Sequence, residues 1–197
     1  MIQPLIALQR VLDQTQNRID FLAPLALRLY LTPVFLTAGL NKLYGFEGVV
    51  QWFGNADWGL GLPLPWLMAS LATATEVIGA VLLLFGFGVR WVTIPLMITM
   101  LVAIFSVHLQ HGWQAVVDPQ SPFPPEDIAE AGERLERARA ILQEHGNYEW
   151  LTNSGNFVIS NNGVEWAVTY LIMLLALLIL GGGRLVSIDY WIRKQLM

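Results

Sequence analysis

Apolar residues along this chain are gathered into four long blocks, and they do not alternate regularly with polar residues. A helix needs about 20 residues to cross roughly 30 Å of hydrocarbon, because each residue adds about 1.5 Å of length. The blocks predict four transmembrane helices, near residues 21–41, 63–87, 89–110 and 164–182. The predicted fold is therefore all-α, an integral membrane four-helix bundle.

The positions of lysine and arginine predict the orientation of this bundle. The side that holds both termini has six of these residues, namely Arg10, Arg18, Arg90, Arg184, Arg193 and Lys194. On the opposite side only Lys42 is close to a span, since three arginines of the second outer connection lie far along a loop. Cationic residues favour the cytoplasmic side. We therefore expect a multi-pass protein of the bacterial inner membrane with both termini in the cytoplasm.

The segments outside the blocks have patterns of their own. Residues 1–20 place leucines against polar residues as in a helix that lies on the cytoplasmic membrane surface, with a polar tail as the alternative. The connection 44–62 is rich in tryptophan and glycine, which favours a loop in the membrane interface. The outward-facing loop 111–163 contains a predicted amphipathic helix, which lies near residues 126–144.

Two pairs on that amphipathic helix, Glu130–Arg134 and Glu133–Arg137, have the favourable i,i+4 order. We interpret the helix as a solvated cap over the bundle, and a surface for a protein partner is the alternative. Only 13% of the residues are charged, against about 25% in soluble domains. The chain has no cysteine, which excludes thiol–disulfide exchange, thiolate metal sites and cysteine-ligated clusters by its own residues.

Four acid–base side chains lie inside the apolar blocks: Arg28, Glu76, His108 and Glu165. A charge at the bilayer centre costs about 2.5 kcal/mol or more, so we expect these groups to converge inside the bundle. Counting from the span ends places Arg28 and Glu76 at similar depth, which predicts an ion pair. Such a pair either fixes the register of the helices or takes part in chemistry.

His108 and Glu165 are predicted near the outer interface, with His111 three residues further on. Two imidazoles and a carboxylate are a ligand set for zinc or Cu(II), but an H-x-x-H spacing alone is a weak signal. We favour a polar cluster in which His108 is hydrogen-bonded to Glu165 or to the first outer connection, and we predict no metal site.

Trp52 and Trp66 are predicted at the same outer level, together with Trp113 and Trp166. Tryptophan at this depth usually forms a belt at the membrane interface. The alternative is a slot for a flat apolar ring such as a quinone head group.

Several stretches of the chain resemble the DoxX family of small four-helix membrane proteins. They are LRLYLTPVFLTAGLNKLYGF, the WFG and GLPLP of the first outer connection, TEVIGAVLLLFGFGVR, PLMITMLVAIFSVHLQHGW, and the closing GGGRLVSIDYWI. The resemblance implies a membrane subunit of a redox system, since relatives include the membrane subunit of a thiosulfate:quinone oxidoreductase and members linked to oxidative-stress complexes. The long outer insert is more similar to a branch named HvfX, associated with maturation of copper-binding ribosomally made peptides.

Two functions follow as hypotheses. The first is a membrane subunit of a quinone-linked redox system. Its expected catalytic residues are Glu76, Arg28 and His108, and the residues expected to bind quinone are Trp52, Trp66, Lys42 and Glu165. The second is a non-catalytic membrane partner in maturation of a copper-binding modified peptide, or an anchor for a soluble oxidoreductase. A small-solute carrier is disfavoured, because four helices make a small bundle. We expect a lipid bilayer around the protein, a periplasmic protein partner or self-association, and no nucleic acid.

Overall fold

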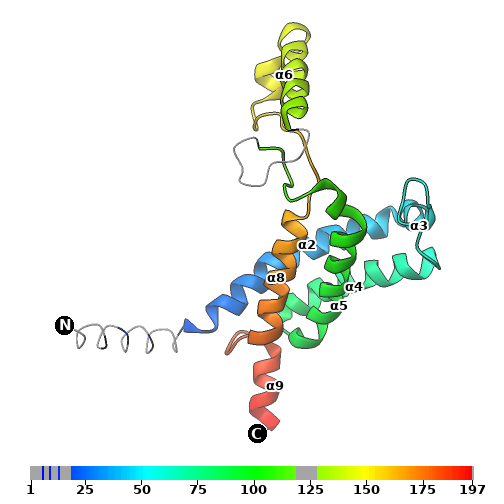
Figure 1. Ribbon diagram of the computed structural model, residues 1–197. Coiled ribbons are helices and arrows are strands. Elements are labelled where there is room, and N and C mark those ends of the chain that lie inside the picture. Colours follow the sequence, from blue (N-terminus) through cyan, green and yellow to red (C-terminus); the bar gives the residue numbers. More distant parts are fainter. Residues whose placement is uncertain (1–5, 7–8, 10–12, 14–18, 119–127, 197) are drawn as a thin grey trace. The chain divides into compact units, whose positions relative to one another are not determined.

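The computed structural model describes residues 6, 9, 13, 19–118 and 128–196 (Figure 1). The chain divides into two compact units, residues 1–100 with 170–197 and residues 101–169. The predicted surface helix of residues 1–20 falls largely outside the described residues.

The first unit is built on α2 (Leu22–Tyr44) and α4 (Pro65–Phe85), together with most of α5 (Val89–Ala103) and most of α8 (Glu165–Leu180). Its core is a cluster of buried apolar side chains from these four helices: Leu31, Phe35, Ala80, Leu83, Val89, Val92, Leu96, Leu174 and Leu177. Among the described residues the regular structure is helical, apart from an isolated bridge. The predicted all-α fold is confirmed.

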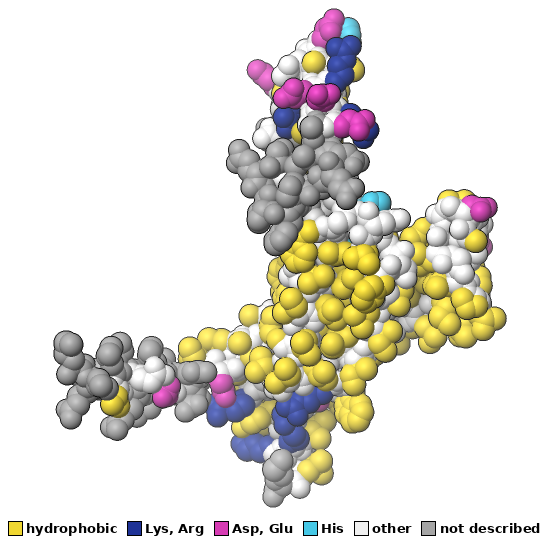
Figure 2. Space-filling view, in the orientation of Figure 1, with side chains coloured by type: hydrophobic (Ala, Val, Ile, Leu, Met, Phe, Trp, Pro, Cys, Tyr) yellow, Lys and Arg dark blue, Asp and Glu magenta, His cyan; other side chains and the backbone are white. Residues whose placement is uncertain are grey.

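Three helical segments are long and apolar enough to cross a membrane: α2, α4, and the continuous run Val89–His111. The fourth apolar helix, α8, is shorter, with 16 residues. Hydrophobic side chains cover much of the surface of these helices in Figure 2, and Ile179 of α8 is 67% exposed. A face of this kind is stable in lipid and not in water. The protein is therefore an integral membrane helical bundle, while the count of four spans stays a prediction.

The first connection is a helix, α3 (Phe46–Gly54), where a loop was expected. Its amphipathic pattern buries Phe53, and the helix packs on α4. The chain then turns back at Asn55, whose side-chain oxygen accepts hydrogen bonds from the backbone N–H groups of Asp57 and Trp58. Gly59 passes so close to the Trp52 carbonyl that a Cβ would lie 1.9 Å from its oxygen.

The end of α8 also differs from the expected bounds. Helix α8 stops at Leu180 because Gly181 takes a left-handed conformation, with φ of 76°, whereas the fourth span was expected to reach residue 182. A further helix, α9 (Ile188–Leu196), follows the turn. The Ser187 hydroxyl accepts a hydrogen bond from the Tyr190 N–H at 3.2 Å and so caps its first turn.

In the second unit the backbone of α5 continues as a π-helical turn, Ile104–His108, and a short 3-10 turn, Leu109–His111. The insert forms α6 (Ile128–His145) and α7 (Tyr148–Leu151). The predicted insert helix is thus confirmed, and its Glu130–Arg134 ion pair forms.

Candidate functional site at Lys42 and Glu76

Helices α2 and α4 approach each other closely at Gly39. A Cβ on Gly39 would lie 2.7 Å from Val77 Cγ2 and 3.0 Å from Glu76 Cβ. A similar close approach, of Gly79 to the Leu96 side chain, brings α5 against α4. Glycine allows helix backbones to approach each other in this way. These contacts place the middle of α4 directly beside the last turns of α2.

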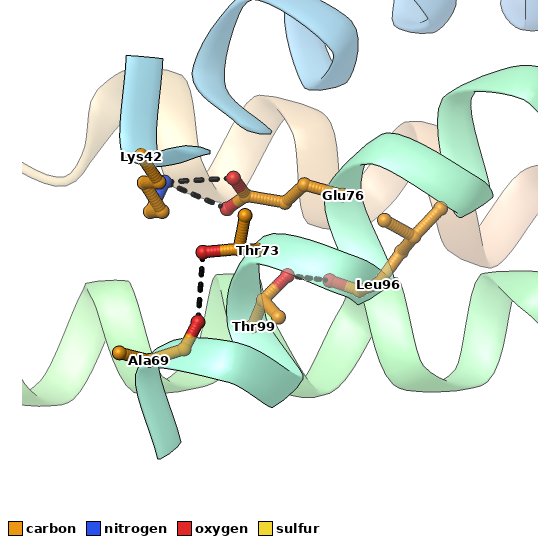
Figure 3. Close-up of polar contacts among 6 residues, drawn as sticks. All are labelled: Lys42, Ala69, Thr73, Glu76, Leu96 and Thr99. Carbon is orange, nitrogen blue, oxygen red and sulfur yellow. Dashed lines mark hydrogen bonds and ion pairs between the residues drawn. The ribbon is translucent and has the colours of Figure 1, made fainter. Parts of the chain in front are cut away.

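At this contact Lys42 forms an ion pair with Glu76. The Lys42 ammonium donates to both carboxylate oxygens, with Nζ 2.9 Å from Oε1 and 2.7 Å from Oε2 (Figure 3). The two side chains differ in exposure, since Lys42 is 28% exposed and Glu76 only 5%. The carboxylate is therefore held inside the protein, and the cation reaches it from the edge.

Two threonine hydroxyls near the pair are occupied by their own helices. Thr73 donates to the Ala69 carbonyl and Thr99 to the Leu96 carbonyl, each at 2.7 Å (Figure 3). In the described part of the chain the Glu76 carboxylate accepts hydrogen bonds from Lys42 alone. A buried carboxylate with a single cationic partner is suited to exchanging a proton or binding a polar ligand group.

The predicted Arg28–Glu76 pair is wrong. The Arg28 guanidinium is 1% exposed and donates to four backbone carbonyls, at distances from 2.6 to 3.1 Å, contributed by Leu83, Leu84, Gly182 and Val186. Along α2, Arg28 lies about 16 Å from Gly39, which is the residue that faces Glu76. The last carbonyls of a helix lack donors within the helix, so the guanidinium completes the end of α4 and cannot reach the carboxylate.

The turn after α4 is fitted closely around Arg28. Gly86 has φ of 66°, and a Cβ there would lie 2.6 Å from the Arg28 Cζ atom. Asp189 of α9 accepts hydrogen bonds from the Gly88 and Val89 N–H groups, at 2.7 and 3.0 Å, and so caps the start of α5. Arg28 and Asp189 together join the C-terminal segment to the α4–α5 turn.

The polar cluster expected in the second unit does not form as predicted. His108 Nδ1 is hydrogen-bonded to the Asn162 carbonyl at 2.7 Å, and Glu165 instead accepts from the Ala115 N–H at 3.0 Å. Within the described ranges no three side chains of His, Cys, Asp or Glu are grouped so that they could hold a metal ion. The structure therefore does not bring His108, His111 and Glu165 together as a ligand set, because the His108 and Glu165 side chains contact different backbone groups and the His111 ring contacts the Gln110 side chain.

The predicted quinone-binding tryptophans lie in the first unit and contact neighbouring aromatic rings. Trp66 meets Phe46 edge-on at 6.1 Å between ring centroids, and Trp52 meets Phe53 at 5.5 Å. Trp66 is 65% exposed, as expected for a ring at the membrane interface. The expected slot also included His108 and Glu165, which belong to the second unit. The slot as a whole stays a prediction.

Sequence reasoning missed the partner of Glu76, although the signal was present. Lys42 falls on the same face of α2 as Arg28 and Gly39, and a lysine stem is long enough to reach inward. Asp189 was missed for a different reason. It reads as part of a charged tail, and no sequence pattern connects it to the turn at Gly88.

Residues 23–109 of the chain match the DoxX family. The chain carries a DoxX domain. The matched range confirms the resemblance found in the sequence, and it contains Lys42 and Glu76 but not the insert. The DoxX domain therefore includes the whole α2–α4 site.

Two relatives of this chain have names that bear on function. One, from Bacillus subtilis (strain 168), is named "Putative oxidoreductase CatD" and is 36% identical over 94 residues, which cover 48% of this chain and 66% of that protein. The other, "Inner membrane protein YphA" of Escherichia coli (strain K12), is 36% identical over 63 residues, covering 32% of this chain and 42% of that protein. The chain thus spans just under two thirds of the first and less than half of the second. No solved structure matches it.

Proposed function

We propose that this DoxX protein is a membrane subunit of a quinone-linked redox system in the bacterial inner membrane. The observation that carries the proposal is the Lys42–Glu76 pair, an ionisable couple held in the apolar contact between α2 and α4. The names of the two relatives, an oxidoreductase and an inner membrane protein, support it.

The pair has the chemistry that quinone reduction needs. A quinone takes up two electrons and two protons to become a quinol, so its oxygens must exchange protons with a nearby group. Glu76 is the group proposed to exchange them. Lys42 has three N–H donors, of which two bind Glu76, and the third is proposed to donate to a quinone carbonyl.

The electrons come, in this proposal, from a soluble oxidoreductase that docks on the protein. The chain has no cysteine with which to supply them by thiol–disulfide exchange. Trp52 and Trp66 are proposed to contact the quinone ring. We leave Arg28 out of the chemistry, because four carbonyls already take its donors.

Quinone binding to the purified protein tests this proposal. We expect co-extracted quinone in the preparation, and saturable quenching of tryptophan fluorescence by a short-chain quinone. Lys42→Met is expected to weaken the affinity about tenfold, which is the lower end for a hydrogen bond to a charged donor. The control Glu133→Gln, on the exposed face of α6, should leave affinity unchanged. A folded sample that carries no quinone and shows no saturable quenching overturns the proposal.

The second candidate is a non-catalytic membrane partner for peptide maturation, or an anchor for a soluble enzyme. It is favoured by apolar side chains exposed on the insert, where Trp150 is 73% and Val158 60% exposed. Genes beside the one for this chain separate the candidates. A gene for a cysteine-rich peptide with its modifying enzyme favours the partner, and sulfur-oxidation genes favour the quinone-linked subunit.

A further inference from the structure

Helix α9 presents an apolar face that the rest of the described chain leaves uncovered. Ile188, Ile192 and Leu196 follow one another at i, i+4 and i+8, with Trp191 beside them, and so share one side of the helix. Their exposures range from 39% for Ile192 to 81% for Leu196. Four large apolar residues on one side of a nine-residue helix need a cover other than water.

The opposite side of α9 and the adjoining turn carry positive charge. Over residues 184–197 the chain has three cations, Arg184, Arg193 and Lys194, against one carboxylate, Asp189. Arg184 forms an ion pair with Asp20 at 3.1 Å, so Arg193 and Lys194 carry the charge of this helix. That carboxylate is engaged with the N–H groups at the start of α5. Figure 2 shows Lys and Arg side chains gathered near the end of α8, where α9 begins.

Three of the nearby cations keep most of their donors free for a ligand. Arg90 donates one hydrogen bond to the Ile179 carbonyl, Arg193 one to the Asp189 carbonyl, and Lys194 lies over the Trp191 ring at 5.2 Å. None of these three forms an ion pair with a described carboxylate. Exposed guanidinium and ammonium groups of this kind bind phosphate.

We propose that α9 lies on the membrane surface and, with Arg90, forms a binding site for the headgroups of anionic phospholipids. Its apolar side enters the acyl region, continuous with the exposed Ile179 and Leu185, and Arg193 and Lys194 face the phosphates. A second copy of the chain is a poorer cover, because a helix of about 13 Å offers far less area than the roughly 800 Å² per partner of a stable interface.

Lipid binding by the full chain tests the charged half of the site. Delipidated protein is titrated with phosphatidylglycerol and with phosphatidylcholine, and retained lipid is measured by native mass spectrometry. We expect preference for phosphatidylglycerol, and a loss of about fivefold in its affinity for each cation removed. Arg193→Gln with Lys194→Gln should thus lose about 25-fold. The control Arg134→Gln with Arg137→Gln, on α6, should lose nothing.

The absence of cysteine allows a matching test of the apolar half. A nitroxide is attached to Ile192→Cys or to Lys194→Cys in protein reconstituted with phosphatidylglycerol. The label at position 192 should be accessible to oxygen and protected from a water-soluble nickel complex, and the label at 194 should show the reverse. Equal nickel access at both positions, dipolar broadening between labels of two copies, or an unchanged lipid preference in the charge variant overturns the proposal.

Discussion

Lys42 and Glu76 form an ion pair in which the anion is buried and the cation is not. The Glu76 side chain is 5% exposed, and that of Lys42 is 28% exposed, although their atoms meet at 2.7 Å. When the pair is broken, a lysine at the edge can turn toward water or headgroups. A carboxylate in the interior cannot do so. Loss of Lys42 should therefore lower the free energy of unfolding more than loss of Glu76.

Removing the cation is expected to destabilise the protein more than removing the anion. Lys42→Met leaves Glu76 buried without a partner, at a cost of about 3–5 kcal/mol. Glu76→Gln leaves a lysine that can reorient, and should cost about 1–3 kcal/mol. Reversible unfolding in mixed detergent micelles measures both. The double variant Lys42→Met, Glu76→Gln should recover part of the loss, and strictly additive losses would show that the pair contributes nothing to stability.

Methyl groups added to two glycines should have opposite effects. Gly39→Ala places a Cβ 2.7 Å from Val77 Cγ2 and 2.9 Å from the Val77 nitrogen, so the helices must separate, at about 1–3 kcal/mol. Gly48→Ala in α3 meets nothing within 4 Å and should stabilise the helix by about 0.5–1 kcal/mol. Thermal unfolding followed by circular dichroism compares them. Equal melting temperatures would contradict close α2–α4 packing.

Arg28→Lys is expected to lower stability by about 2–4 kcal/mol, since one ammonium cannot reach carbonyls of both α4 and the C-terminal segment. The matched variant is Arg90→Lys, in which an exposed arginine donates one hydrogen bond to a carbonyl. It should stay within about 0.5 kcal/mol of the parent. Quinone affinity of folded Arg28→Lys should equal that of the parent. If folded Arg28→Lys binds quinone more weakly than the parent, Arg28 takes part in quinone binding.

Comparing alanine at Gly86 with alanine at Gly88 distinguishes the cost of backbone strain from the cost of a clash with Arg28. Gly86 and Gly88 have similar φ values, 66° and 60°, so alanine at either should cost about 1–2 kcal/mol in strain. Only at Gly86 does the new Cβ meet the guanidinium, at 2.6 Å from Cζ, whereas nothing lies within 4 Å at Gly88. Gly86→Ala should therefore cost about 1–3 kcal/mol more than Gly88→Ala, measured by the same unfolding assay. Equal costs would mean that the guanidinium moves freely.

Most of the helical fold follows from the sequence, because the period and length of apolar blocks are set by the bilayer. The expected spans 21–41 and 63–87 correspond to α2 and α4 within three residues at each end. Helix α3 was missed because its glycines and tryptophans also suit a loop. What makes it a helix is its packing on α4, and a single segment does not reveal that contact.

The site was harder to predict than the fold. The depth of Arg28, counted from the ends of the span, does not show whether its partner is Glu76 or a group of backbone carbonyls. Every residue has a carbonyl, so the sequence does not reveal which carbonyls accept hydrogen bonds from Arg28. The carbonyls become acceptors only where α4 ends and where residues 182–186 return beside it. The Lys42–Glu76 pair depends in the same way on Gly39, which sets how near the two helices come.

The four carbonyls around Arg28 have a consequence for biosynthesis. Two belong to α4, which is synthesised soon after α2, but Gly182 and Val186 are synthesised only after α5, the insert and α8. Until then a buried guanidinium retains unsatisfied donors, which is costly in an apolar setting. The early helices therefore remain incomplete in the membrane until residues 182–186 have been synthesised. A chain truncated before Gly182 should therefore fail to complete its assembly and be degraded by membrane proteases.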